Sequence, residues 1–168
     1  MEKRPRIKLK HTTTDKAIEV IACFSLLVVW GLIVINYNNL PDIIPIHFNG
    51  SGEADRFEGK KNIWNLPIVA SVFYVVLSLL NRFPHVFNYP TKITKENVLR
   101  QYTNATRLIR SIKLIFIVLF GLIEFKTIQI AKGQAEGLGT WFFPFVLATV
   151  FIPILYFYRK LTKRTSVP

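Results

Sequence analysis

Hydrophobic residues along this chain gather into four long blocks that are separated by polar and charged segments. The blocks span about residues 17–37, 63–80, 112–131 and 138–158. Each block approaches the ~20 residues that an α-helix needs to cross ~30 Å of hydrocarbon. Helices are expected because backbone N–H and C=O groups in lipid have no water to bond. The pattern therefore predicts an all-α membrane protein with four transmembrane helices in one integral domain over residues 1–168.

The third block is less uniform than the others, because it contains Lys113, Glu124 and Lys126. Glu124 would lie roughly 10 Å inside the outer end of this helix at the usual helical rise. An ionisable side chain at that depth is expected to face the bundle interior or water and to have a partner. Glu124 is therefore an intramembrane candidate for a proton or solute path. The alternative is a carboxylate that snorkels outward or bonds a neighbouring helix.

Composition and charge support the membrane interpretation. Of the 168 residues 51% are hydrophobic, yet the formal net charge is +12. A strongly basic chain can indicate nucleic-acid binding, because cations neutralise phosphates. Here the charges fall between the apolar blocks, so the membrane explains them better and no nucleic-acid partner is expected.

The positions of lysine and arginine predict the orientation. Most of the 22 lie in the N-terminal segment, in the segment between the second and third blocks, and in the C-terminal tail. The remaining cations are Arg56, Lys60, Lys61, Lys126 and Lys132. Because cytoplasmic loops carry an excess of lysine and arginine, both termini are expected in the cytoplasm of a multi-pass cell-membrane protein.

The segment 81–111 predicts an amphipathic helix. Thr94 is a plausible N-cap. Apolar residues then recur at three- and four-residue spacing, at Val98, Tyr102, Ala105, Ile109 and Ile112. The arginines of this segment lie off the apolar stripe, at positions 100, 107 and 110. We therefore expect a basic cytoplasmic helix on the inner leaflet that runs into the third span.

The segment 38–61, between the first two spans, predicts a structured outer loop. Pro41 and Pro45 bar a regular helix, so residues 40–48 should be extended. Asn49-Gly50 and Gly52 are turn signals that permit positive φ. The expected result is a short, hairpin-like lid on the outer face of the bundle.

The same loop carries a motif with two prolines, a histidine, a glycine and an acid in fixed register. It consists of Leu40, Pro41, Asp42, Pro45, His47, Phe48, Asn49, Gly52 and Asp55, followed by Lys60. This motif resembles a bacterial membrane family known as domain of unknown function sixteen-forty-eight. That domain also forms the N-terminal part of SdpI-type immunity proteins, which protect cells against a secreted peptide toxin. The resemblance covers residues 17–80 well and 81–125 loosely, and the last span has no counterpart among the additional helices of the immunity proteins.

The resemblance implies no residue roles, so the loop residues are judged by their chemistry. The candidate outer-loop site comprises Pro41, Asp42, Pro45, His47, Asn49, Gly52 and Asp55. His47 either ties the lid together by a hydrogen bond or acts as a proton-sensitive contact, a ligand contact or a metal ligand. The acids of the loop lack the tight spacing of a metal site, so no metal is expected.

No sequence motif for catalysis is present, such as HExxH, a nucleophile elbow or a phosphate-binding glycine loop. Cys23 is the only cysteine, which excludes an intrachain disulfide. We therefore expect a non-catalytic envelope protein without a cofactor, whose outer loop binds a peptide toxin or another membrane protein, as an immunity protein or a sensor would. The alternatives are a small-solute transporter subunit, which would need a homo-oligomer to enclose a path, and an enzyme using His47 and an acid.

Overall fold

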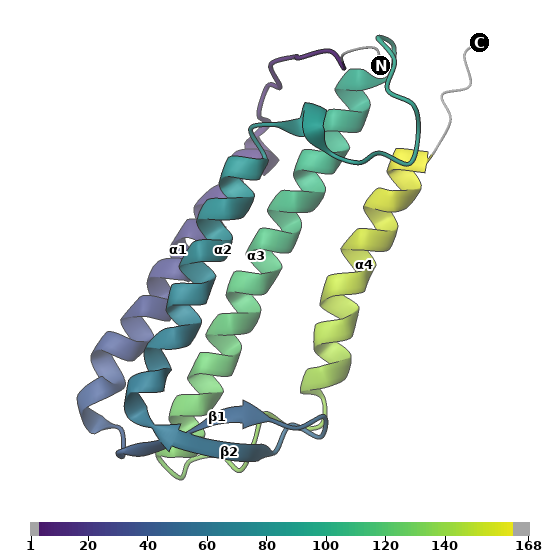
Figure 1. Cartoon of the computed structure of the whole chain (residues 1–168). Coiled ribbons are helices and arrows are strands. Elements are labelled where there is room, and N and C mark those ends of the chain that lie inside the picture. The colour runs from purple at the N-terminus through teal and green to yellow at the C-terminus, as the bar shows by residue number, and fades with distance from the viewer. Residues whose placement is uncertain (1–3, 163–168) are drawn as a thin grey trace.

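The computed structural model describes residues 4–162, which are mostly helical (Figure 1). The long helices are α1 (Thr13–Asn36), α2 (Asn65–Leu80), α3 (Val98–Ala131) and α4 (Phe142–Thr162). Short 3₁₀ helices flank them: η1 (Tyr37–Asn39), η2 (Lys60–Trp64) and η3 (Pro84–Val86). Helix α3 lies at the centre, since α1, α2 and α4 all pack against it.

The two ends of the bundle differ. Residues 4–12, the segment 84–97 and the end of α4 lie together at one end, which we call the terminal end (Figure 1). A two-stranded antiparallel sheet of β1 (Ile43–Phe48) and β2 (Ala54–Gly59) lies across the other, the hairpin end. Three of the cations from which the orientation was predicted lie outside the described residues: Lys3, Lys163 and Arg164.

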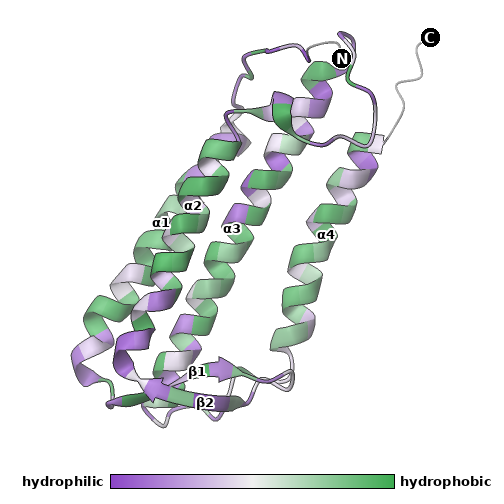
Figure 2. Cartoon of the chain, in the orientation of Figure 1, coloured by the Kyte–Doolittle hydropathy of each residue, from purple (hydrophilic) through white to green (hydrophobic). Residues whose placement is uncertain are grey.

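Within residues 4–162, three helical segments are long and apolar enough to cross a membrane: Thr13–Asn39, Lys60–Leu80 and Phe142–Thr162. They expose large apolar side chains such as Phe24, Val72 and Phe151, as lipid-facing helices do. Helix α3 is more mixed, with polar positions along its length (Figure 2). The membrane-spanning character of the first, second and fourth blocks is thus supported, whereas a crossing by α3 stays a prediction.

The amphipathic helix predicted before the third span does run into that span, but its apolar stripe does not lie on lipid. Val98–Ala131 forms one continuous helix of 34 residues. It begins after Asn97, not Thr94; the Asn97 side-chain oxygen accepts a hydrogen bond from the Thr94 N–H at 2.9 Å. The apolar stripe packs on protein instead of lipid: Tyr102 is fully buried and its hydroxyl donates to the Pro5 carbonyl at 3.1 Å.

Aromatic stacking completes this end of α3. The Tyr89 ring stacks on Tyr102 with 5.6 Å between the ring centroids. Burial raises the pKa of the Tyr89 hydroxyl, which therefore stays protonated and donates to the Pro84 carbonyl at 2.8 Å. The segment 84–97 is thereby folded against the first turns of α3.

A row of ion pairs joins α1 to α3; we call it the ion ladder, formed by Asp15 and Glu19 of α1 and Arg107, Arg110 and Lys113 of α3. Arg107 Nε lies 2.8 Å from Asp15 Oδ1, and Arg110 Nε lies 3.2 Å from Glu19 Oε1. Lys113 is fully buried, contacts Glu19 through its Nζ and donates to the Ser78 hydroxyl of α2 at 2.8 Å. The acids are spaced i, i+4 and the cations i, i+3, so each set lies on one helix face.

The predicted hairpin is confirmed as the two-stranded sheet. Its strands pair from Ile43 opposite Gly59 to Phe48 opposite Ala54, with register shifts on either side of His47. At the turn, the Asn49 side-chain oxygen accepts hydrogen bonds from the N–H groups of Ser51 and Glu53, at 2.9 and 3.0 Å. A core cluster beneath the sheet consists of Ile33, Leu40, Ile44, Ile63 and Ile128.

The tip of the hairpin packs on the loop between α3 and α4. Leu138 N–H donates to the Gly52 carbonyl at 2.7 Å, and Gly137 forms a bridge with Glu53. Gly52 has φ of 83°, and a Cβ there would lie 2.9 Å from the Gly139 carbonyl oxygen. This docked loop also explains why α4 begins at Phe142, later than the fourth hydrophobic block.

We predict that Glu19→Gln lowers the stability of the protein by about 3 kcal/mol, because it leaves the buried Lys113 ammonium without its carboxylate. Adding Lys113→Met should recover part of the loss, since no unpaired charge then remains at that position. Thermal unfolding of the purified protein in detergent measures both effects. Glu96→Gln removes an exposed acid and is the matched control; an equal effect of this variant would contradict the prediction.

Gly52→Ala should destabilise the hairpin end by about 1–3 kcal/mol, because it places a side chain at positive φ and against the backbone of Gly139. Gly50→Ala is the control, because a Cβ at Gly50 would meet no atom within 4 Å. Hydrogen exchange of residues 43–59 in the two variants checks the prediction. Equal protection in both variants would show that the contact between the tip and the loop contributes no stability.

Candidate functional site

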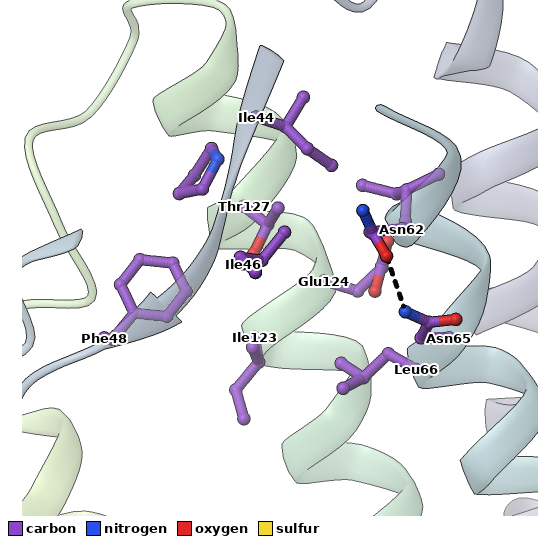
Figure 3. Close-up of a pocket in the computed structure, with 11 residues that line it drawn as sticks. Ile44, Ile46, Phe48, Asn62, Asn65, Leu66, Ile123, Glu124 and Thr127 are labelled. Atoms are coloured by element: carbon purple, nitrogen blue, oxygen red, sulfur yellow. Dashed lines mark hydrogen bonds between the residues drawn. The ribbon is translucent and has the colours of Figure 1, made fainter. Parts of the chain in front are cut away.

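A pocket of about 180 Å³ lies beneath the hairpin; we call it the hairpin pocket (Figure 3). Strand β1 lines it with Ile44, Pro45, Ile46 and Phe48. The segment of η2 and α2 contributes Asn62, Ile63, Asn65 and Leu66, and α3 contributes Ile123, Glu124 and Thr127. Its wall is therefore apolar, with a few polar groups that converge from η2, α2 and α3.

Glu124 is the only ionisable residue that lines the hairpin pocket. Its exposed fraction is 2%, and its Oε1 atom has no hydrogen-bond partner. No cation within residues 4–162 forms an ion pair with it. A buried carboxylate without a partner is costly to ionise, so a proton or a cationic ligand would stabilise it.

The neighbouring amides do not satisfy this carboxylate. Asn65 Nδ2 donates to Asn62 Oδ1 at 3.1 Å, as the dashed line in Figure 3 shows. Asn62 Nδ2 donates to Glu58 Oε2 and to the Gly59 carbonyl, both at 3.1 Å. The side chains of the pocket wall thus hold one another in place and leave Glu124 Oε1 without a hydrogen-bond partner.

Of the predicted outer-loop residues, only Pro45 lines the pocket. His47 Nδ1 hydrogen-bonds Asp55 Oδ1 across the strands, and both side chains are about half exposed, at 54% and 44%. This contact matches the alternative in which His47 ties the lid together. The pair lies on the hairpin without contributing to the pocket.

The other motif residues shape the ends of the hairpin. Asp42 closes its base, with Oδ1 3.2 Å from Lys60 Nζ and its carbonyl 2.8 Å from the Lys60 N–H. Pro41 precedes this contact, while Asn49 and Gly52 form the turn and the docked tip. Within residues 4–162, no three His, Cys, Asp or Glu side chains gather in a way that could hold a metal ion.

Sequence reasoning missed both the ion ladder and the polar wall of the pocket. Arg107, Arg110 and Lys113 were not predicted to pair with α1, although the acids Asp15 and Glu19, spaced i, i+4, were a detectable signal. Asn62 and Asn65 stand at the start of the second hydrophobic block, but nothing in the sequence indicates that they face Glu124.

Residues 24–70 match the family described as "Domain of unknown function (DUF1648)". An "Uncharacterized protein" of Archaeoglobus fulgidus is 30% identical over 87 residues, which cover 47% of this chain and 48% of the relative. The chain thus spans about half the length of that relative. No solved structure matches the chain. The match contains the second half of α1, the hairpin and the first turns of α2. It falls on the family that the hairpin motif resembles, so the predicted resemblance to that family is confirmed over these residues.

Proposed function

We propose that this chain is a non-catalytic multi-pass membrane protein whose hairpin end binds a peptide or a partner protein through a cationic group. The observation that carries the proposal is Glu124, a buried carboxylate that lines a roofed pocket with one oxygen unpartnered. A lysine ammonium or an arginine guanidinium from the ligand would supply the missing charge and hydrogen bond.

The orientation follows from charge. Most lysines and arginines belong to the terminal end, which we place in the cytoplasm, so the hairpin end faces the outside. Helix α3 runs alongside α1 and α2 from one end of the bundle to the other (Figure 1). A bundle inserted through α1, α2 and α4 therefore carries α3 across the membrane as well, which makes four crossings.

Charge at the hairpin end differs from that of the rest of the chain. Although the chain has a net charge of +12, most of its acidic residues belong to this end. Besides Glu124 they are Asp42, Glu53, Asp55, Glu58 and Glu136. These six acids slightly outnumber the five cations of the same end, so a positively charged partner is repelled less here than at the terminal end.

The concrete form that we propose is toxin immunity or signal reception in a bacterial cell envelope. Membrane-active peptides commonly carry lysine and arginine on their polar face. The resemblance of the hairpin motif to the N-terminal domain of SdpI-type immunity proteins points to the same class of ligand.

A small-solute transporter subunit is the second candidate, and the buried Glu124 favours it. Intramembrane carboxylates often belong to ion or proton paths. The bundle would need further copies of the chain to enclose such a path. Solute flux that responds to Glu124→Gln would support transport, whereas peptide binding without flux supports the first proposal.

Both termini should lie on the cytoplasmic side. In a chain with Cys23→Ala, a cysteine introduced by Gly50→Cys at the hairpin tip should react with an impermeant maleimide in intact cells. A cysteine introduced by Glu96→Cys should react only after permeabilisation. The reverse labelling pattern would invert the orientation and place the pocket in the cytoplasm.

Cells that produce the wild-type chain should survive a panel of cationic membrane-active peptides better than cells with an empty vector. Glu124→Gln should remove this protection and weaken peptide binding by about tenfold or more, because a charge-assisted hydrogen bond contributes about 1.5–3 kcal/mol. Survival curves and calorimetric titration of the purified protein measure the two effects. Membrane levels are matched by blotting.

Glu136→Gln is the matched control, since Glu136 is exposed at the same end and does not line the pocket. If both variants protect cells as well as the wild type does, the Glu124 carboxylate does not bind the ligand. If the wild type gives no protection at matched membrane levels, the immunity proposal is rejected and transport becomes the favoured function.

A further inference from the structure

A second pocket, of about 200 Å³, lies at the terminal end between α1, α3 and α4; we call it the terminal pocket. Its polar wall includes Arg107 and Ser111 of α3 and Lys160 of α4. Its apolar wall includes Ile18 of α1 and Phe157 of α4. The pocket therefore combines cations with a hydrophobic side. Two of the helices that line it, α1 and α4, are long and apolar enough to cross a membrane.

The charges around this pocket do not cancel. The ion ladder has three cations and two acids, so it carries a surplus positive charge. Arg107 is held by Asp15 at 2.8 Å and by the Thr12 hydroxyl at 3.1 Å, which fixes its guanidinium at the pocket. Asp15 also lines the pocket, but its negative charge is offset by Arg107 and by Arg110, whose Nη1 lies 3.9 Å away.

Lys160 adds a second positive charge on the opposite wall. Its ammonium lies 4.5 Å from the centre of the Tyr156 ring, and its side chain is exposed. No carboxylate of residues 4–162 forms an ion pair with it. The two walls thus present a guanidinium and an ammonium with a net positive charge between them.

The depth of the pocket matches the boundary between lipid headgroups and acyl chains. Tyr156 and Tyr158 mark the end of the apolar part of α4, followed by Arg159 and Lys160. At the rim, Gln101 Nε2 donates to the Leu161 carbonyl at 2.9 Å, which joins the end of α4 to α3. Helix α4 packs mainly along α3, so an acyl chain can follow the apolar surface between α4 and α1.

We propose that the terminal pocket binds the headgroup of an anionic phospholipid. The phosphate would lie between Arg107 and Lys160, with the Ser111 hydroxyl as a further donor, and the acyl chains would run past Ile18 and Phe157. Basic pockets between transmembrane helices on the cytoplasmic side are suited to anionic headgroups. The surplus charge favours an anionic lipid over a zwitterionic one, whose own ammonium group would meet the same cations.

The test is native mass spectrometry of the full chain, purified in detergent and mixed with phosphatidylglycerol or phosphatidylcholine of the same acyl chains. We expect at least about a fivefold preference for phosphatidylglycerol, which corresponds to about 1 kcal/mol for one surface cation. Lys160→Gln should reduce this preference about fivefold, and Lys160→Arg should retain it. Arg159→Gln removes a neighbouring cation that does not line the pocket and should leave the preference intact.

Two outcomes would overturn the proposal. An equal loss in Arg159→Gln and Lys160→Gln would mean that the lipid responds to general surface charge, not to this pocket. Binding of millimolar inorganic phosphate together with equal binding of the two lipids would mean that the pocket recognises free phosphate and not a lipid headgroup. Unfolding midpoints of the variants, measured without added lipid, exclude misfolding as the cause of a loss.

Discussion

A charged side chain inside an apolar bundle is costly unless it is paired, and this constraint acts where α1 and α3 meet. Lys113 is fully buried, so its ammonium needs the Glu19 carboxylate and the Ser78 hydroxyl. The neighbouring pairs of Arg107 with Asp15 and Arg110 with Glu19 repeat the contact along the same two faces. The ion ladder is therefore consistent with one register of α1 against α3, in which all of these pairs form together.

The hairpin pocket is formed by two parts of the chain, and the family match covers only one of them. The matched segment 24–70 supplies its roof and the α2 wall, whereas Glu124 and Thr127 come from α3, outside that segment. The motif residues mostly build the roof: Asp42 closes the base of the hairpin and Gly52 docks its tip. The hairpin motif is thus better explained as the scaffold of a site than as the site itself. The carboxylate on which the proposed binding rests lies below the hairpin, on a helix that the family match does not cover.

The parts that could be predicted from the sequence are those that depend on local pattern. Uninterrupted apolar runs predicted three of the membrane helices, and the prolines and the Asn49-Gly50 turn predicted the hairpin. The surface against which an apolar helix face packs could not be predicted in this way. The apolar stripe of Val98, Tyr102 and Ala105 fits a lipid surface as well as it fits the folded segments at 4–12 and 84–97. Its spacing says nothing about which of the two covers it. Glu124 could be recognised as unusual from its position in an apolar block. The pocket around it could not be predicted, because it depends on how three separate elements converge.

The contact between Gly52 and the loop before α4 has a consequence for the order of folding. Strands β1 and β2 are close in the chain, so the hairpin can form as soon as residues 43–59 are available. Its tip, however, bonds Leu138, and that contact closes a much longer loop of chain. Local pairing is fast and distant closure is slow. We therefore expect α4, which packs mainly along α3, to be the last helix fixed during folding. The absence of a side chain at Gly52 is what lets the loop before α4 come close enough to form this contact.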